Sequence, residues 1–497
     1  MKHSRSFVLI LSCVALIMRG VRAETAIFNT PLPLLTTSLR AALNDGVQSA
    51  ERATNPKDRD RALGALASAF AKIGDFPMAL SLANRLGDAD SRAGVLGRIG
   101  RVQANFGRDE KGAKTTFAAA QSAALAITTG VYERNSALSS LARAQAQTND
   151  FEGATQTAAQ IKGFGGGDVL ENIAHLAARE GELDPVEAFA KVAPQDKQSV
   201  AARWLYVVHL NISNPLEASK YLPKITGVQD KIASMLARQD LYDDEKDARA
   251  LTLLDQVLEL VPKVESTGEI DMSDLVRDAD MAHIARRQLE AGRFDQALGT
   301  LAKIKSPDSE FPIYVEFASV LTRKKQLKKA LDLGTPLSLG LRSATLGAVI
   351  REQNRKIRFA DENDKAGLKK DLDIIVNGTL EWLETEDAKS SDLNWAKVSV
   401  VTGFARGDDF EHARKLAQSI ALPRQKANAF AGIARAALEN KDVALASAQL
   451  TEMRAAAHEV EEPQECAQII AQSVVSICDP LLEDEEPSMG AIFGGLN

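Results

Sequence analysis

The chain is organised by a spacing of apolar positions that returns at about nine places between residues 63 and 453. In each copy a large apolar residue is followed three positions later by another, and then directly by a small residue. An aromatic or aliphatic residue follows nine positions later, an alanine three further on, and an aliphatic residue seven after the alanine. Such steps put residues on one face of a helix. The pattern therefore predicts two antiparallel helices joined by a turn.

The copies differ in how closely they keep these offsets. The first copy consists of Leu63, Leu66, Ala67, Phe76, Ala79 and Leu86. Four others keep the offsets and begin at Leu138, Met281, Tyr314 and Phe430. Weaker copies begin near Leu96, Leu170, Tyr206 and Val401. A lone hairpin of this kind cannot bury both of its faces, so the copies are expected to stack into an all-α solenoid.

The turn between the two helices has its own residue pattern. Glycine or asparagine ends the first helix, as expected for a residue in the left-handed conformation; these residues are Gly74, Gly107, Asn149, Gly181 and Gly292. Aspartate follows at Asp75 and Asp150, where a side-chain oxygen can cap the returning helix.

Two intervals between turns, from residue 215 to 294 and from 327 to 410, are about twice the usual length. Each has room for one degenerate hairpin with a long second helix. We expect 231–241 to pair with 248–261, and 342–353 to pair with 366–386. The array then contains about eleven hairpins.

The ends of the chain differ from the repeats. Residues 24–54 are predicted to form an N-terminal capping region, because a solenoid must cover its first apolar face. The array proper spans 55–462, and 463–480 are expected to form a C-terminal capping helix. The remaining 481–497 are acidic and glycine-rich, which is typical of disorder.

The first 23 residues are typical of a secretory signal peptide. A basic start at Lys2 and Arg5 precedes an apolar run from Phe7 to Met18, with cleavage expected after Ala23. Retention as an anchor and lipidation at Cys13 remain alternatives. The sequence thus predicts a secreted or periplasmic protein.

Composition and charge narrow the function. The chain is 45% hydrophobic but only 5% aromatic, which favours closely packed helices. Losing the signal removes four basic residues and moves the formal net charge from −7 to −11. An acidic chain without a basic cluster argues against nucleic acid as a partner. No second long apolar run follows the signal, so no integral membrane segment is expected in the mature chain.

The repeat resembles the tetratricopeptide family. That family's Leu-Gly pair corresponds to Leu66-Ala67, its Gly-Asp-Tyr turn to Gly74-Asp75-Phe76, and its turn alanine to Ala79. The family's tryptophan is missing from every copy. The resemblance covers most of 59–453 and implies a right-handed superhelix whose concave groove binds a protein or peptide. Related α-superhelices, including the ring-forming helical domain of periplasmic lytic transglycosylases, remain alternatives.

Candidate chemistry is sparse. Glu171 with His175, and Asp280 with His283, could each supply two metal ligands, but zinc sites need three or four. Residues 107–115 lack the contiguous Gly-Lys-Thr of a phosphate-binding loop, and the glycine-rich 163–168 is interpreted as an inter-repeat loop. We therefore expect no catalytic residue, no cofactor and no metal. Cys466 and Cys478, 12 residues apart on one helix, are too far apart to bridge.

A basic residue recurs near the start of many first helices, where the helix dipole disfavours it. These residues are Arg59, Arg92, Arg134, Arg277, Arg342 and Lys426. Pairing between repeats, with aspartates such as Asp58, Asp60, Asp88 and Asp90, is the favoured interpretation. A ladder of cations along one rim that binds an acidic peptide is the functional alternative.

The sequence as a whole predicts a non-enzymatic scaffold for a protein or peptide. Two alternatives remain: an accessory subunit of a cell-envelope enzyme or transport complex, and a glycan-binding superhelix. The glycan hypothesis is weakened because only Trp204, Trp382 and Trp395 are available to stack on sugars.

Overall fold

A computed structural model describes residues 32–128, 130–162, 166–212, 214–239, 256–257, 259–261, 273–290, 292–305, 311–334, 337–384 and 391–482. Over these ranges the chain is all-α, with two short 3-10 turns and no strand. The expected signal peptide and segment 483–497 lie outside the described residues. None of the described helices combines the length and the apolar character needed to cross a membrane.

Ten antiparallel hairpins have both helices described. The first five are α3 (Pro56–Lys72) with α4 (Phe76–Asn84), α5 (Ala89–Asn105) with α6 (Glu110–Leu125), α7 (Val131–Ala146) with α8 (Phe151–Ala158), α9 (Gly166–Glu180) with α10 (Leu183–Val192), and α11 (Gln198–Asn211) with α12 (Pro215–Ser219). The other five are α15 (Ser273–Glu290) with α16 (Phe294–Leu301), α17 (Phe311–Arg323) with α18 (Leu327–Gly334), α19 (Leu339–Phe359) with α20 (Glu362–Glu384), α21 (Ser391–Arg406) with α22 (Phe410–Gln418), and α23 (Pro423–Glu439) with α24 (Val443–His458). The expected all-α solenoid of stacked helical hairpins is confirmed.

The two long intervals have different outcomes. In the second, α19 and α20 form the expected degenerate hairpin, each helix longer than predicted. In the first, α13 (Val228–Gln239) lies where its first helix was predicted, but most of 248–261 lies outside the described residues.

The turn chemistry follows the prediction at most positions. Gly74, Asn149, Gly181 and Gly292 have positive φ, as expected for helix-ending residues. At the predicted Gly107 the left-handed residue is instead Arg108, with φ 48°, because one inserted residue lengthens this turn.

The aspartates predicted as caps also act as such. Asp75 accepts from the backbone N–H of Met78, and Asp150 from that of Gly153. Each therefore satisfies a free donor at the start of the returning helix.

A buried polar pair recurs inside three hairpins. The side-chain oxygen of Gln145 on α7 accepts a hydrogen bond of 2.7 Å from the Thr157 hydroxyl on α8. Gln103 with Thr116, and Gln288 with Thr300, make the same contact at 2.7 and 2.8 Å. Because a buried polar group is costly without a partner, these pairs fix how the two helices meet.

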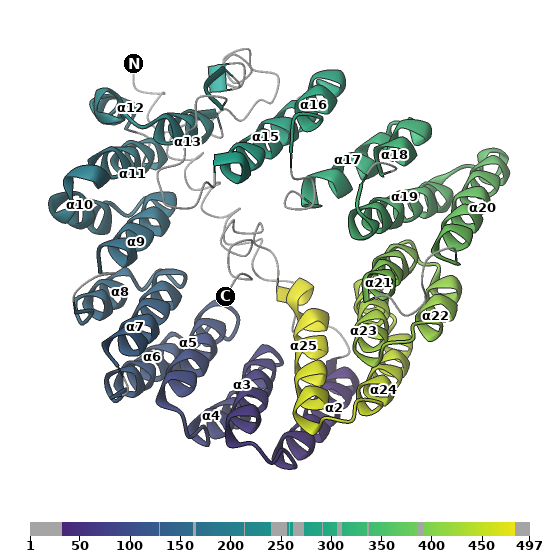
Figure 1. Ribbon diagram of the computed structural model, residues 1–497, viewed down its shortest axis with the longest axis horizontal. Coiled ribbons are helices and arrows are strands. Elements are labelled where there is room, and N and C mark those ends of the chain that lie inside the picture. The colour runs from purple at the N-terminus through teal and green to yellow at the C-terminus, as the bar shows by residue number, and fades with distance from the viewer. Residues whose placement is uncertain are drawn as a thin grey trace, which may run out of the picture.

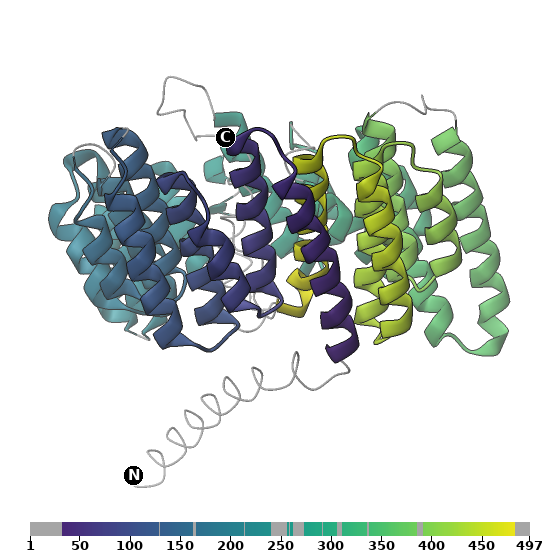
Figure 2. The same ribbon diagram turned by 90° about the horizontal axis from the view of Figure 1, so that it is seen from below.

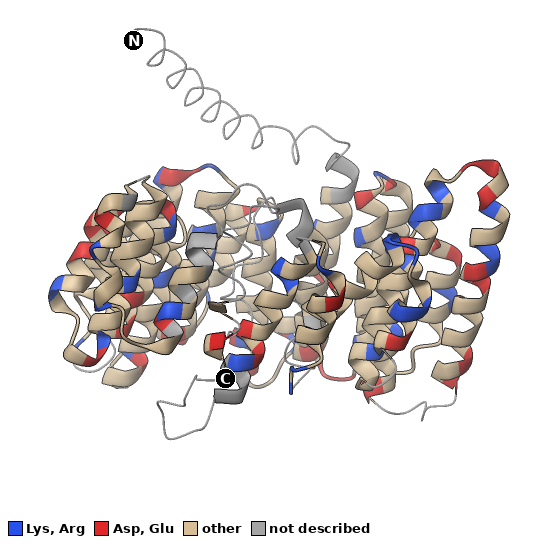
Figure 3. Cartoon of the chain, turned by 90° about the horizontal axis from the view of Figure 1, so that it is seen from above, with Lys and Arg blue, Asp and Glu red and all other residues tan. Residues whose placement is uncertain are grey.

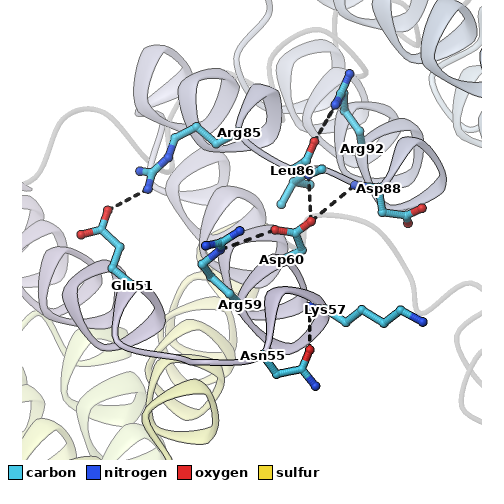
Figure 4. Close-up of polar contacts among 10 residues, drawn as sticks. Glu51, Asn55, Lys57, Arg59, Asp60, Arg85, Leu86, Asp88 and Arg92 are labelled. Atoms are coloured by element: carbon cyan, nitrogen blue, oxygen red, sulfur yellow. Dashed lines mark hydrogen bonds and ion pairs between the residues drawn. The ribbon is translucent and has the colours of Figure 1, made fainter.

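A side chain near the start of the first helix also holds the loop that ends the same hairpin. Asp60 Oδ2 accepts from the Gly87 N–H at 2.8 Å (Figure 4). Asp278 accepts from Lys305 and Asn394 from Ala421, each at 3.0 Å. All three contacts span 27 residues, so this clasp is part of the repeat.

The hairpins are arranged around a ring, with the first helices on the inside and the second helices on the outside (Figure 1). Consecutive first helices pack on each other, for example α3 on α5 and α21 on α23. At one such contact a Cβ added to Gly403 would lie 2.4 Å from the Cα of Gly347, so α19 and α21 touch backbone to backbone.

The two ends of the described chain close the ring. The predicted C-terminal cap is α25 (Pro463–Leu482), an inner helix packed between α23 and α3. The predicted N-terminal cap is α2 (Leu32–Glu51), which packs on α25 and α24 (Figure 2). The two helices thus form one further hairpin, whose first helix comes from one end of the sequence and whose second helix comes from the other.

Polar and apolar contacts cross this closure. Ser38 and Ser447 hydroxyls lie 2.9 Å apart, and Arg454 forms an ion pair with Asp45. One cluster of buried apolar side chains includes Leu43 of α2, Leu66 of α3 and Ile470 of α25. The core is therefore continuous across the junction of the two ends.

Candidate functional site

Three of the six cations predicted at helix starts, Arg92, Arg342 and Lys426, make close contacts within the solenoid. Arg92 donates to the Leu86 carbonyl at 2.6 Å, where α4 ends (Figure 4). Lys426 pairs with Glu459 at 3.1 Å, and the Arg342 guanidinium lies 4.4 Å from the Trp382 ring centre. The structure thus favours the structural interpretation for these residues.

The aspartates predicted as partners of these cations make different contacts. Arg59 lies 3.9 Å from Asp60, which is long for an ion pair. The Asp60 carboxylate instead accepts hydrogen bonds from backbone N–H groups. Asp88 caps α5 through Ser91, which lowers its pKa, and Asp58 pairs with Arg61. Arg92, Arg342 and Lys426 are therefore offset by a backbone carbonyl, an aromatic ring and a glutamate rather than by the predicted aspartates.

A second set of arginines lies between the inner helices, and we call it the inner arginine belt. Its members are Arg98, Arg101, Arg286, Arg351, Arg406 and Arg435. Arg101 donates to Gln147 across α5 and α7 at 2.7 Å, and Arg351 donates to Ser319 across α19 and α17 at 2.8 Å. Both signs of charge are spread over the helices as a whole (Figure 3), so the belt is a local feature.

The sequence carries a signal for part of the belt. The position directly after the small residue of the first helix is arginine in four copies of the repeat. These residues are Arg101, Arg143, Arg286 and Arg435, of which all but Arg143 belong to the belt. Cations that keep a constant offset from a buried position are expected to lie on the same face of the solenoid. In the structure this face is the inner one.

One pocket on this face, the closure pocket, exists only because the ends of the chain meet. It is a cavity of about 440 Å³ lined by α3, α5, α23 and α25, including Arg98 and Arg435. Arg98 donates to the Ser68 hydroxyl at 3.1 Å. Desolvation by the surrounding side chains, and then the nearby charge of Arg101, lower the pKa of Arg98.

A second pocket, the rim pocket, lies where α19, α21 and α23 end. It is a cavity of about 420 Å³ with four arginines, Arg351, Arg355, Arg358 and Arg406, in its lining. Phe359, 75% exposed, stands at its edge.

The carboxylates of the rim pocket are already engaged. Glu352 is buried and lies 3.5 Å from Arg351, Asp408 pairs with Arg358, and Glu439 lies 3.9 Å from Arg406. Among the described residues, Arg355 contacts no carboxylate. The pocket therefore combines a free cation with an exposed aromatic ring.

The two acid–histidine pairs considered as metal ligands, Glu171 with His175 and Asp280 with His283, lie in different surroundings. Glu171 binds Lys197 at 2.7 Å, while His175 stacks on Trp204 with ring centres 4.5 Å apart. Asp280 and His283 lie on the inner helix α15, where burial raises the pKa of Asp280 to about 7 and lowers that of His283 to about 4. Within the described ranges no three potential ligands lie together.

The remaining histidines and cysteines make local contacts. His209 stacks on Tyr221, His412 bonds Asp409 at 2.8 Å, and the His458 ring lies 3.5 Å from Cys466. Cys466 and Cys478 are free thiols, buried on α25, as their spacing predicted.

The tryptophans do not form a common platform for a sugar. Trp204 lies on α11 under Arg203, and Trp382 on α20 under Arg342. Trp395 on α21 is 43% exposed.

The segments set aside as nucleotide sites run into helix starts. Residues 107–109 form the turn between α5 and α6, and 110–115 begin α6. Of the glycine-rich 163–168, only 166–168 are described, and they begin α9.

No protein-family model and no curated protein matches the chain. Among solved structures, Ton1535 from Thermococcus onnurineus NA1 is 18% identical with a TM-score of 0.24, covering 61% of this chain and 94% of its own. Yeast Tom70 is 15% identical with a TM-score of 0.27, over 86% of this chain and 89% of its own. A circular tandem repeat protein with novel repeat topology is 12% identical with a TM-score of 0.13, over 90% and 98%. These likenesses carry no argument about function.

Proposed function

We propose that the protein is a non-enzymatic ring scaffold that holds an acidic segment of a protein or peptide against its inner face. The observation that carries the proposal is the inner arginine belt on a chain whose formal net charge is −7. Cations gathered on one concave face of an acidic protein attract a ligand of opposite charge.

The two pockets suit such a ligand. Each places arginine beside apolar surface: Arg98 and Arg435 with Ala65 and Val475 in the closure pocket, and Arg355 with Phe359 in the rim pocket. Arginine is suited to carboxylates because its planar fork can bind both oxygens at once. A peptide that alternates acidic and apolar residues therefore fits this face best.

We further propose that the protein acts in the periplasm or outside the cell. The support is the sequence of residues 1–23, with its basic start, apolar run and Ala23. The proposal assigns no reaction to the chain.

Binding can be measured with three fluorescent peptides of equal length, rich in glutamate, glutamine or lysine, by anisotropy against the full chain. We expect the glutamate peptide alone to bind, and its affinity to fall as salt rises, because exposed charges are screened. The variant Arg98→Glu with Arg435→Glu should weaken it about tenfold or more, since two attractive contacts become repulsive. The matched control is Arg414→Glu, an exposed cation on the outer helix α22.

Equal binding of the three peptides, or equal loss in the control, would contradict the proposal. Cross-linked capture from the native envelope then separates the alternatives. One dominant protein lost in the double variant supports the scaffold. Co-purification of an enzyme or transporter that stays bound to the double variant favours the accessory subunit, and glycan without protein favours the glycan-binding superhelix.

A further inference from the structure

The rim pocket poses a question that the scaffold proposal leaves open, because its cation Arg355 contacts no carboxylate in the described part of the chain. Four arginines line this pocket together, namely Arg351, Arg355, Arg358 and Arg406, against the three carboxylates of Glu352, Asp408 and Glu439. The cluster is thus a place where positive charges are held together. Such a cluster calls for an anion.

The chain carries an acidic segment that begins near this pocket. Four acidic residues follow α25 directly, and they are Glu483, Asp484, Glu485 and Glu486. An apolar pair, Ile492 and Phe493, comes after them. Along the segment, acidic residues therefore come before apolar ones. Along the rim from α25, Arg406 of α21 likewise comes before Phe359 of α19.

The direction of α25 decides where this segment starts. Arg424, near the start of α23, lies 4.0 Å from Glu465, near the start of α25. Further along, Arg435 of α23 shares the closure pocket with Ser476 of α25. The two helices are therefore parallel, and α25 ends at the same rim as Glu439 and Asn440, which line the rim pocket.

The distances are compatible with docking in the same chain. Neighbouring helices pack about 8–10 Å apart, so α21 lies roughly 20 Å and α19 roughly 30 Å from α25. An extended chain covers about 3.3 Å per residue. Residues 485–486, with their side chains, therefore reach Arg406, and residues 492–493 reach Phe359.

The closure pocket suits this segment less well. It is lined by Arg98 in the middle of α5 and by Ala471 and Val475 in the middle of α25, although Arg435 lies one turn before the end of α23. A segment that leaves α25 at the rim would have to reverse to reach them.

We propose that segment 483–497 docks in the rim pocket of its own chain, with Glu485 and Glu486 on Arg406, where Arg355 lines the same pocket, and its apolar residues on Phe359. Docking places an internal competitor on the inner face. An acidic partner then has to displace the segment, and this regulatory consequence rests on the proposed function, whereas the docking itself does not.

The test uses the full chain without any partner. A photo-crosslinking phenylalanine analogue is placed at Phe493, and the cross-linked peptides are mapped by mass spectrometry. We expect links to the peptide that contains Phe359. In Arg355→Glu with Arg406→Glu the yield should fall about tenfold, as expected when attractive ion pairs become repulsive, while Arg414→Glu should leave it unchanged.

A second variant covers the case in which the charge reversal unfolds the rim. Glu485→Gln with Glu486→Gln changes only the segment, and it should lower the same cross-link yield several-fold. Links to other parts of the ring, or a yield that neither variant changes, would overturn the inference. Mixing isotopically heavy and light chains provides the last outcome: links between the two isotopes would show docking in a second copy and would also overturn it. Binding of the glutamate peptide can fail independently of all these results.

Discussion

The contact between Gly347 and Gly403 gives the sharpest prediction, because backbone meets backbone there. The substitution Gly403→Ala places a Cβ 2.4 Å from both the Cα and the carbonyl oxygen of Gly347. Unlike the end of a flexible side chain, neither atom can turn away. Helices α19 and α21 must therefore separate.

The cost follows from the geometry. Ordinary contact begins near 3.4 Å, so the helices have to move apart by about 1 Å, an overpacking that costs about 1–3 kcal/mol. Alanine gains about 0.5–1 kcal/mol over glycine inside a helix. The control Gly378→Ala, on α20 with nothing within 4 Å of its added Cβ, has that gain without the clash. The two variants should thus differ by about 1–3 kcal/mol.

Amide hydrogen exchange read by mass spectrometry is the suitable assay, because repeat arrays need not unfold in one step. Amides of α19 and α21 should open more easily in Gly403→Ala than in Gly378→Ala, while α3 and α5 keep their protection. Arg351 and Arg406 lie one turn beyond the two glycines, so the rim pocket should widen as well. Equal protection of α19 and α21 in both variants would refute the reasoning.

Two further predictions concern buried polar groups. Thr157→Val leaves the buried side-chain oxygen of Gln145 without its hydroxyl donor, and it should destabilise α7 and α8 by about 1–3 kcal/mol. The control is Thr155→Val, because the Thr155 hydroxyl bonds a carbonyl of its own helix. An equal loss of stability in both variants would count against the Gln145–Thr157 pair. In the folded chain the pKa of Asp280 is about 7, raised by burial from 3.8. As pH rises, the carboxyl of Asp280 therefore loses its proton in the unfolded state before it does so in the folded state. The stability of the fold should fall between these two pH values, by at most about 4 kcal/mol. Asp280→Asn should remove that part of the fall, measured as the difference in melting temperature between pH 4 and pH 8, and an unchanged difference would show that Asp280 is not its source.

The hairpins could be predicted from sequence because their signals are local. A left-handed glycine at Gly74 and a cap at Asp75 are properties of neighbouring residues, and the structure has both. The shift from Gly107 to Arg108 is a local exception that one inserted residue produces.

The closure could not be predicted in the same way. The curvature of a solenoid is a small rotation repeated at every contact between repeats, and it depends on details such as the approach of Gly347 to Gly403. The sum of all these rotations determines whether α2 meets α25. Helices expected to cap two separate ends therefore appear instead as the two halves of one hairpin.

The candidate site shows the same division. Arginine directly after the small residue was visible in the repeat, so Arg101 and Arg435 could have been assigned to one face. The closure pocket could not have been found, because Arg98 and Arg435 lie on helices from opposite ends of the chain.

The most direct test of the closed ring is a disulfide between its two ends. The hydroxyls of Ser38 and Ser447 lie 2.9 Å apart, on residues separated by 409 positions. Thiols placed there need only a small adjustment to reach the S–S bond length of about 2.05 Å. In Ser38→Cys with Ser447→Cys we expect rapid formation of an intramolecular bond under mild oxidation, seen as a shift in non-reducing electrophoresis. Ser38→Cys with Ser399→Cys, on the distant helix α21, should not form it. A Ser38–Ser447 pair that oxidises no faster than this control, while circular dichroism shows native helix, would contradict the ring.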